Sequence, residues 1–318
     1  MQTFLTFFLF AVGLVLIIKG GDWFVDAASW IAKVSGIPQF IIGATIVSIA
    51  TTLPEILVSV MAAAQGNVEM ATGNAIGSVT ANTGMILGLS IIFMPVAVNR
   101  NKYLPKSLIL MGAIVLLWAL SLNGELTLFA SIIMFLCFAF FIYENIIEAK
   151  RDMTPNEEKG EGNTDKKTVT INILKFVVGA AFIVIGSRLL VNEGTVIATD
   201  ILHIDERIVS LTLVAVGTSL PELVTTLTAI AKKQSSLSVG NIVGANIIDM
   251  LLILPICSFI SGGSLPVAFT TIWIDLPVAL LVTLITLLPM LITKKFHRWQ
   301  GILSLAVYIG YVILICVI

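Results

Sequence analysis

Apolar residues occur along this chain in long stretches separated by short polar turns. A helix of about 20 apolar residues is long enough to cross the roughly 30 Å hydrocarbon core of a bilayer. Ten such stretches lie at 3–30, 38–64, 70–98, 105–122, 126–148, 171–199, 206–231, 236–261, 268–292 and 299–317. The pattern therefore predicts an all-α integral membrane protein with ten transmembrane helices.

One segment interrupts this pattern. Residues 149–170 are rich in charge, contain glycine and show no hydrophobic periodicity. These properties are typical of a solvated linker. The linker divides the chain into two halves of five predicted spans each, at 1–148 and 171–318.

The composition agrees with a membrane environment. Of the 318 residues, 58% are hydrophobic and only 12% are charged. The formal net charge of −1 says nothing about partners; besides the lipid bilayer, we expect neither nucleic acid nor an obligatory protein partner. The cysteines, Cys137, Cys257 and Cys316, fall in predicted spans without metal-ligand spacing, so we expect small core hydrophobes.

Lysine and arginine predict the orientation, because they concentrate in cytoplasmic loops. If the N-terminus is outside, the inside loops contain Lys33, Arg100, Lys102, Lys106, Lys150, Arg151, Lys159, Lys166, Lys167, Lys232, Lys233, Lys294, Lys295 and Arg298. The outside loops are mainly acidic, with Arg207 as the exception. We expect both termini outside and the linker in the cytoplasm.

The first stretch lacks a basic n-region and leads directly into more apolar sequence, so we expect a retained span and no signal peptide. The loops are short, and the N-terminus does not resemble a transit peptide. Both features favour a multi-pass protein of the plasma (cell inner) membrane.

A segment of the chain is repeated without a gap after 167 residues. Thr51–Glu55 reads T-T-L-P-E and Thr218–Glu222 reads T-S-L-P-E. Gly73–Asn82 reads G-N-A-I-G-S-V-T-A-N and Gly240–Asp249 reads G-N-I-V-G-A-N-I-I-D. Because five spans is an odd number, the second copy enters the membrane in the opposite direction. Inverted repeats with a site near the midplane are typical of secondary transporters.

Each copy places a glutamate directly after a proline, Glu55 after Pro54 and Glu222 after Pro221. Proline has no N–H and must kink or break the helix. Carbonyls released near these breaks belong to Ala50, Thr51, Gly217 and Thr218. In lipid, both free carbonyls and carboxylates are costly, and such carboxylates usually mark functional sites.

The second motif adds close packing and further oxygen atoms. Gly73 and Gly77, like their counterparts 240 and 244, have the spacing that lets two helices approach closely, and Asn82 or Asp249 follows. Hydroxyls near the breaks belong to Thr51, Thr52, Thr218 and Ser219. A set of oxygen donors without histidine or thiol suits hard cations such as Ca²⁺, Na⁺, Mg²⁺ or K⁺.

Each feature alone has a structural explanation: a hydroxyl can bond the preceding turn, a proline kink can shape a helix, and a protonated glutamate can be a hydrogen-bond donor. Two glutamates at equivalent positions after the same motif are hard to explain in that way.

At these residues the chain resembles the Ca²⁺:cation antiporter superfamily, specifically its sodium/calcium exchanger branch. The duplicated segments are similar to that family's two α-repeats, here about 40–90 and 207–257. The resemblance covers all ten spans, the linker and the R-W-Q-G-I-L start of the last span (Arg298–Leu303). It implies ten helices in two inverted five-helix repeats and a secondary active antiporter that exchanges Na⁺ for Ca²⁺. It also implies alternating access, in which the long spans 3–30 and 171–199 slide against an eight-helix core.

The resemblance also assigns ligands. Ca²⁺ would be held by Glu55 and Glu222 with the carbonyls of Thr51 and Thr218, while Asn82 and Asp249 would complete the middle of the site. Na⁺ would share the glutamates and add Thr52, Ser78, Ser219 and the carbonyls of Ser48 and Ala215.

Two departures from the family pattern matter. Ala245, the partner of Ser78 in the repeat, stands where the family commonly has serine, which puts one Na⁺ site in doubt. The first repeat reads Ala50-Thr51-Thr52 where Gly-Thr-Ser is usual, but Thr52 keeps the hydroxyl.

The charge of the site predicts electrogenic exchange. If Glu55, Glu222 and Asp249 are all ionised, the empty site carries about −3, which three Na⁺ would neutralise and one Ca²⁺ would not. No enzyme activity and no cofactor is expected, since Ca²⁺ and Na⁺ are the transported ions. His203 and His297 lie in predicted loops, and no Ser/Lys or Asp/Asp dyad is present in a recognisable motif.

Three alternatives remain open. A proton/calcium exchanger would use the same scaffold, but that branch typically carries a G-N-A-x-E type motif in place of the L-P-E motifs here. A potassium-dependent sodium/calcium exchanger stays open because of Asp249. A cation channel is disfavoured because the ligands form one compact cluster and no filter-like ring.

Overall fold

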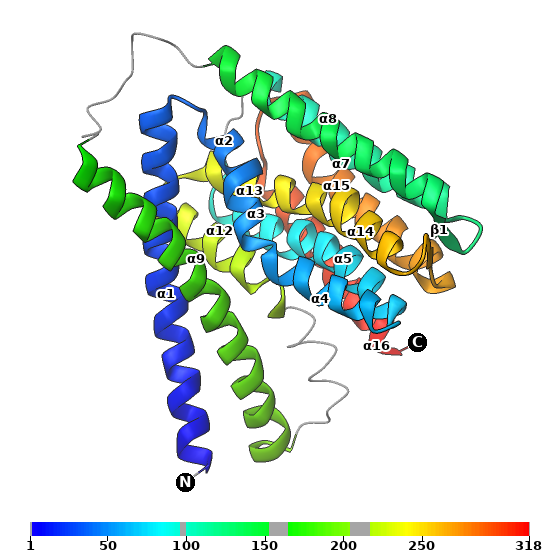
Figure 1. Cartoon of the computed structure of the whole chain (residues 1–318), viewed down its shortest axis with the longest axis horizontal. Coiled ribbons are helices and arrows are strands. Elements are labelled where there is room, and N and C mark those ends of the chain that lie inside the picture. Colours follow the sequence, from blue (N-terminus) through cyan, green and yellow to red (C-terminus); the bar gives the residue numbers. More distant parts are fainter. Residues whose placement is uncertain (1, 96–99, 153–164, 204–216, 318) are drawn as a thin grey trace.

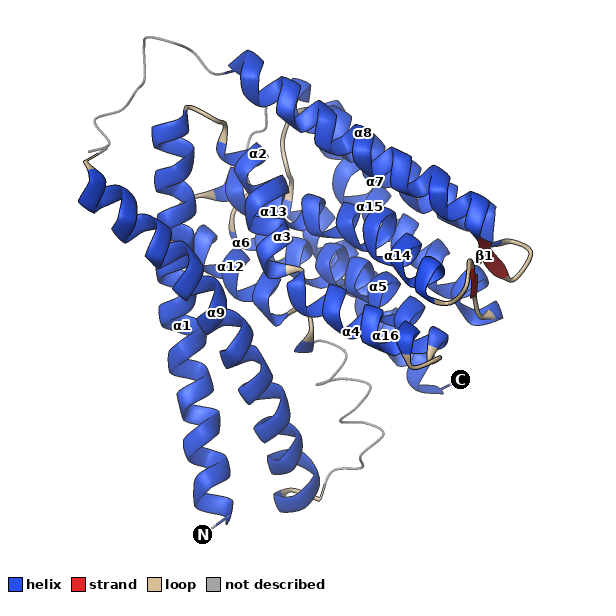
Figure 2. Cartoon of the chain, viewed as in Figure 1, coloured by secondary structure: helices blue, strands red, loops and turns tan. Residues whose placement is uncertain are grey.

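The computed structural model describes residues 2–95, 100–152, 165–203 and 217–317. Nearly all of this part of the chain is helical, and one two-stranded ribbon lies at one end of the molecule (Figure 2). With η denoting a π-helical turn, the helices are α1 (Gln2–Ser35), α2 (Gln39–Ile42), η1 (Gly43–Val47), α3 (Ser48–Thr51), α4 (Leu53–Ala64), α5 (Val68–Ala81), η2 (Asn82–Leu87), α6 (Gly88–Phe93), α7 (Arg100–Ser121), α8 (Leu128–Asp152), α9 (Lys166–Val196), η3 (Ile197–Ile201), α12 (Leu220–Ala231), α13 (Ser235–Ile248), η5 (Asp249–Ile253), α14 (Leu254–Ile260), η6 (Thr271–Asp275), α15 (Leu276–Thr293) and α16 (Arg298–Val317).

The apolar helices confirm a multi-pass membrane protein. Eight helices in the described ranges are long and apolar enough to cross a membrane, and α2–α3 with α4 would make a ninth span bent by 47°. These nine coincide with nine of the ten predicted stretches. The remaining stretch, 206–231, is described only from Gly217 onward, where α12 contributes an apolar helix of 12 residues.

The helices next to the predicted linker extend further than the hydropathy pattern indicated. Helix α8 continues to Asp152, and α9 begins at Lys166. The Asp165 side chain caps α9 by accepting a hydrogen bond of 3.2 Å from the backbone N–H of Thr168. Polar residues continue both helices, because helix formation does not stop where the apolar stretch ends. The central part of the predicted linker, 153–164, lies outside the described residues.

The ribbon is a small addition to the predicted all-α fold. Strands β1 (Glu125–Thr127) and β2 (Ser264–Pro266) pair antiparallel, with Leu126 opposite Leu265. Both leucines are fully buried. The ribbon therefore joins the α7–α8 turn to the segment after α14.

Helices α1 and α9 form an antiparallel pair along one side of the other helices and project beyond them (Figure 1). Their backbones meet at glycines: a Cβ atom on Gly20 would lie 2.8 Å from the carbonyl oxygen of Gly179. A larger residue at this crossing would force the two helices apart.

The centre of the molecule is built from α5–η2–α6 and α13–η5–α14, the two most buried spans in the described chain. Helix α13 lies against α2 and η1, and its Gly240 and Gly244 contact the backbones of Phe40 and Ala44. This confirms the close approach predicted from the second glycine pair.

The first glycine pair behaves differently. Apart from the adjoining turns of α5 itself, nothing in the described chain lies within 4 Å of where a Cβ on Gly73 or Gly77 would stand. The residues that the 167-residue offset pairs with Phe40 and Ala44 are Arg207 and Leu211, and both lie outside the described residues.

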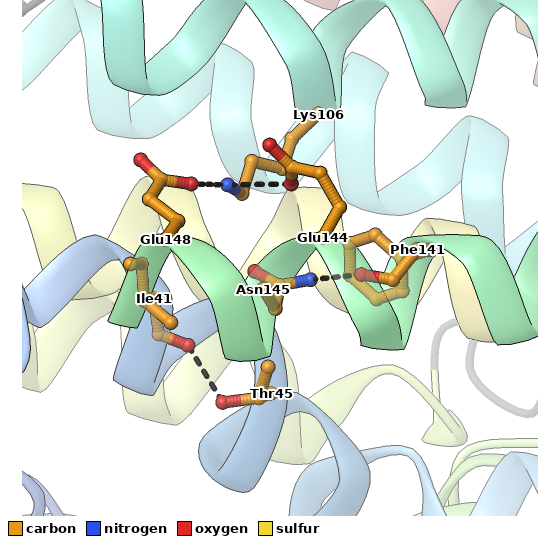
Figure 3. Close-up of polar contacts among 7 residues, drawn as sticks. All are labelled: Ile41, Thr45, Lys106, Phe141, Glu144, Asn145 and Glu148. Carbon is orange, nitrogen blue, oxygen red and sulfur yellow. Dashed lines mark hydrogen bonds and ion pairs between the residues drawn. The ribbon is translucent and has the colours of Figure 1, made fainter. Parts of the chain in front are cut away.

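The lysine and arginine distribution predicts Lys106 in an inside loop, and this prediction is wrong. It lies within α7, is fully buried and forms ion pairs with Glu144, at 3.0 Å, and with Glu148, both on α8 (Figure 3). A lysine side chain can be buried between helices when carboxylates from a neighbouring helix neutralise its charge. This pairing ties α7 to α8.

Candidate functional site

Both copies of the duplicated segment start a new helix at the same place, α4 at Leu53 and α12 at Leu220. Thr52 stands between α3 and α4 with φ −80° and ψ 0°, and Ser219 stands before α12 with φ −87° and ψ 6°. In each copy the chain returns to helix with an equivalent bond, from Ile56 N–H to the Thr52 carbonyl at 3.0 Å and from Leu223 N–H to the Ser219 carbonyl at 3.0 Å. The prediction that the chain breaks at the prolines is confirmed.

The two glutamates lie in the first turns of the helices that follow these breaks. Glu55 is the third residue of α4 and Glu222 is the third residue of α12, and both are at most 1% exposed. A helix N-terminus carries positive partial charge and unsatisfied N–H groups, which favour a carboxylate there. The break thus places each carboxylate deep in the protein beside a favourable dipole.

The second motif of each copy contains a feature that its sequence did not reveal. A π-helical turn begins at Asn82 in the first copy and at Asp249 in the second. Such turns widen a helix locally and often occur at functional sites. Both side chains are buried, at 1% and 0% exposure.

The two copies meet through hydrogen bonds between their polar side chains. Thr52 Oγ1 donates to Glu222 Oε1 at 3.2 Å. Asn82 Nδ2 donates to Asn246 Oδ1 at 3.1 Å, and Asn246 Nδ2 donates to Thr83 Oγ1 at 2.7 Å. Asn246 and Thr83 are not among the predicted site residues, although Asn246 interrupts an apolar span within the duplicated motif.

The three acidic groups are close enough to influence one another. Glu55 experiences the charges of Glu222 and Asp249, and Asp249 experiences that of Glu222. Even so, no three acidic, histidine or cysteine side chains in the described ranges converge closely enough to hold one metal ion together. The three carboxylates therefore do not form one cluster of three acidic ligands within the described ranges.

Eight side-chain oxygens around this site are buried and have no hydrogen-bond partner among the described residues. They are both carboxylate oxygens of Glu55 and of Asp249, Oε2 of Glu222, Oδ1 of Asn82, and the hydroxyls of Ser78 and Ser219. An unsatisfied buried polar group costs about 1–3 kcal/mol, and more when charged. Oxygen atoms left in this state suit cations that bind oxygen ligands.

Three further predicted ligands, Thr51, Ser48 and Thr218, lie in the described part of the chain. Thr51 is buried and donates both to the Ser48 carbonyl, at 3.3 Å, and to Asn241 Oδ1, at 3.2 Å. Ser48 is buried, and its carbonyl also accepts a bond of 2.9 Å from Thr52 N–H, so a cation there would compete with these donors. Thr218 is half-buried, next to Ser219.

Ala215 lies outside the described residues. Ala245, the counterpart of Ser78, is fully buried on α13 and provides no side-chain oxygen.

Comparison with known proteins places this geometry in context. The family model described as sodium/calcium exchanger protein matches residues 5–146 and 171–317. An uncharacterized membrane protein of Methanocaldococcus jannaschii is 33% identical over 307 residues, which cover 94% of each chain. The sodium/calcium exchanger MaX1 of Methanosarcina acetivorans is 29% identical, with 97% of this chain and 98% of MaX1 covered. The structure of the sodium-calcium exchanger NCX_Mj soaked with Na⁺ and Sr²⁺ superposes with a TM-score of 0.83 at 30% identity, covering 96% of this chain and 97% of that one.

Proposed function

Because the chain belongs to the sodium/calcium exchanger family, whose members are transporters and not enzymes, we propose that it exchanges Na⁺ for Ca²⁺ by alternating access. The observation that carries this proposal is the set of eight buried side-chain oxygens, contributed by both copies, that have no hydrogen-bond partner among the described residues. No resident cofactor is needed, since the transported ions are themselves the ligands of these oxygens.

The proposed architecture has ten spans in two inverted five-helix halves, at 1–148 and 171–318, joined by a linker at 149–170. The charge distribution favours both termini outside, the linker in the cytoplasm and a location in the plasma membrane. Lys106 forms a buried ion pair and therefore does not count toward this charge bias, but the other basic residues still favour the same orientation.

In the proposed site, Glu55 and Glu222 with the carbonyls of Thr51 and Thr218 bind Ca²⁺. Na⁺ ions share the two glutamates and use Thr52, Ser78, Ser219 and the carbonyls of Ser48 and Ala215, with Asn82 and Asp249 in the middle. No three acidic side chains in the described ranges converge on one point. This favours several cation positions rather than a single metal centre. Competition for the same glutamates makes Na⁺ and Ca²⁺ exclude each other, which produces exchange in place of co-transport.

The exchange is proposed to be electrogenic. With three ionised carboxylates, a site loaded with three Na⁺ is neutral and a site loaded with one Ca²⁺ keeps about one negative charge. Uncompensated carboxylates near the midplane cost several kcal/mol, which disfavours movement of the empty carrier.

Uptake of ⁴⁵Ca²⁺ into proteoliposomes containing the full chain tests the proposal. A Na⁺ gradient directed out of the vesicles should drive uptake, and a K⁺/valinomycin potential should change its rate. Uptake that ignores the Na⁺ gradient but follows a pH gradient would replace the proposal with a proton/calcium exchanger. Uptake that needs both Na⁺ and K⁺ would favour the potassium-dependent type, which Asp249 keeps as the second candidate.

A further inference from the structure

Two asparagines outside the proposed ligand set occupy equivalent positions in the two copies. Asn74 on α5 and Asn241 on α13 each follow the first glycine of the second motif and are 167 residues apart. In the first copy, Asn74 Nδ2 donates to Ser59 Oγ at 2.9 Å and to the Glu55 carbonyl at 3.3 Å. Asn74 therefore holds α4, the half-helix that carries Glu55, against α5.

The second copy does not repeat this arrangement. The counterparts of Ser59 and Glu55 are Thr226 and Glu222 on α12, yet Asn241 Nδ2 and Thr226 Oγ1 are both buried without a partner among the described residues. Asn241 uses its oxygen instead and accepts a bond of 3.2 Å from Thr51 Oγ1 in the other copy. The two groups left unpaired are those that the repeat would join.

The same side chain thus has two hydrogen-bonding arrangements. In one it holds the glutamate-bearing half-helix of its own copy, and in the other it bonds to the threonine at the opposite break. Unpaired buried donors and acceptors are costly, so each arrangement is favoured only where its partners are in reach. Alternating access in an inverted-repeat carrier moves one part of the molecule against the other around the site, so a bond within one copy and a bond between the copies need not be favoured in the same state.

We propose that Asn74 and Asn241 are positioning residues that exchange these two arrangements during transport, each releasing its glutamate-bearing half-helix in turn. This inference rests on the proposed alternating access. In the state opposite to this structure, Asn241 binds Thr226 and the Glu222 carbonyl, and Asn74 releases Ser59.

The acceptor hydroxyls allow a test that leaves the cation ligands intact. Ser59→Ala removes a bond made in this structure and disfavours this state. Thr226→Val removes a hydroxyl that is unpaired here but needed in the opposite state, and so favours this state. Loss of one buried hydrogen bond should change the ratio of the two states about fivefold, in opposite directions for the two variants.

Spin labels can report this ratio in the full chain, reconstituted in nanodiscs. We would label Lys33→Cys near the end of α1 and Glu69→Cys at the start of α5, both exposed, in a chain with its three native cysteines replaced. Pulsed electron resonance gives the distance distribution in Na⁺ and in Ca²⁺. Thr226→Ser, which keeps the hydroxyl, is the matched control and should behave like the parent chain.

The outcomes distinguish failure of this inference from failure of the proposed alternating access. A single distance that ignores both ions in the parent chain would contradict alternating access itself. Two populations in the parent, with Ser59→Ala and Thr226→Val shifting them oppositely and the double variant restoring the ratio, would support the inference. Two populations that shift in the same direction, or change less than twofold in both variants, would overturn it.

Discussion

Replacing Glu55 with glutamine tests the proposed cation site most directly. Glutamine keeps the size of the side chain and one carbonyl-type oxygen but removes the charge. Glu55 is 1% exposed, and neither carboxylate oxygen has a hydrogen-bond partner among the described residues. Because the carboxylate makes no such bond here, a loss of binding would report the interaction with ions.

The expected loss of cation affinity follows from the burial of Glu55. Removing one partner of a buried charge pair costs about 2–5 kcal/mol, which corresponds to a loss of about 30-fold to 5,000-fold in affinity. Coulomb energy is proportional to the charge of the ion. The free-energy loss for Ca²⁺ should therefore be about twice that for one Na⁺ at the same distance, so the fold loss for Ca²⁺ is about the square of that for Na⁺.

Equilibrium binding of ⁴⁵Ca²⁺ and ²²Na⁺ to the purified full chain, at constant ionic strength, measures both losses. Glu222→Gln is the matched variant in the second copy. Glu69→Gln, at an exposed glutamate in the first turn of α5, is the control and should bind both ions normally. If Glu55→Gln bound both ions within twofold of the parent, or lost Ca²⁺ while keeping Na⁺, the shared-site reasoning would be refuted.

Three further variants test separate parts of the molecule. Ala245→Ser adds a hydroxyl at the buried counterpart of Ser78. The apparent Na⁺ affinity measured by ²²Na⁺ binding should rise about threefold, with little change in Ca²⁺ affinity. An unchanged Na⁺ affinity would show that this position contacts no Na⁺. Gly20→Ala places a methyl group 2.8 Å from a carbonyl oxygen of α9 and should lower stability in denaturant unfolding by about 1–3 kcal/mol. Gly112→Ala is the control, because a Cβ there would contact nothing in the described chain beyond the adjoining turns of α7, and it should not lower stability in this way. Equal losses of stability in both variants would argue against the tight α1–α9 contact. Lys106→Met leaves the buried carboxylate of Glu148 without this lysine and should lower the free energy of unfolding by about 3–5 kcal/mol. Adding Glu148→Gln in the same chain should recover part of this loss. No recovery would mean that lost packing causes the effect.

Much of the candidate site could be predicted because its strongest signals are local. A proline in an apolar span must disturb the helix wherever it lies, and a glutamate beside it must find compensation. The matching backbone angles at Thr52 and Ser219 show that the same five-residue motif produces the same break twice. The glycine pair in α13 likewise predicted a close contact, although its partner helix could not be named.

The side-chain pairing could not be predicted in this way. Thr52 and Glu222 are 170 residues apart, and Asn82 and Asn246 are 164 apart. Which groups meet depends on how two helices from different copies are placed, and shifts of an ångström or two decide whether a hydrogen bond forms. For the same reason, charge alone could not distinguish the buried Lys106 from a lysine in a loop.

The sequence by itself determined the membrane class, the duplicated motif and the positions of the two helix breaks, because hydropathy, repetition and proline act over a few residues. Only the tertiary structure decided which oxygens remain without partners and where equivalent residues behave differently. Asn74 and Asn241 carry the same side chain in the same motif, yet one bonds within its copy and the other across to the opposite copy. Similar local sequences acquire different partners when the surrounding helices are placed differently.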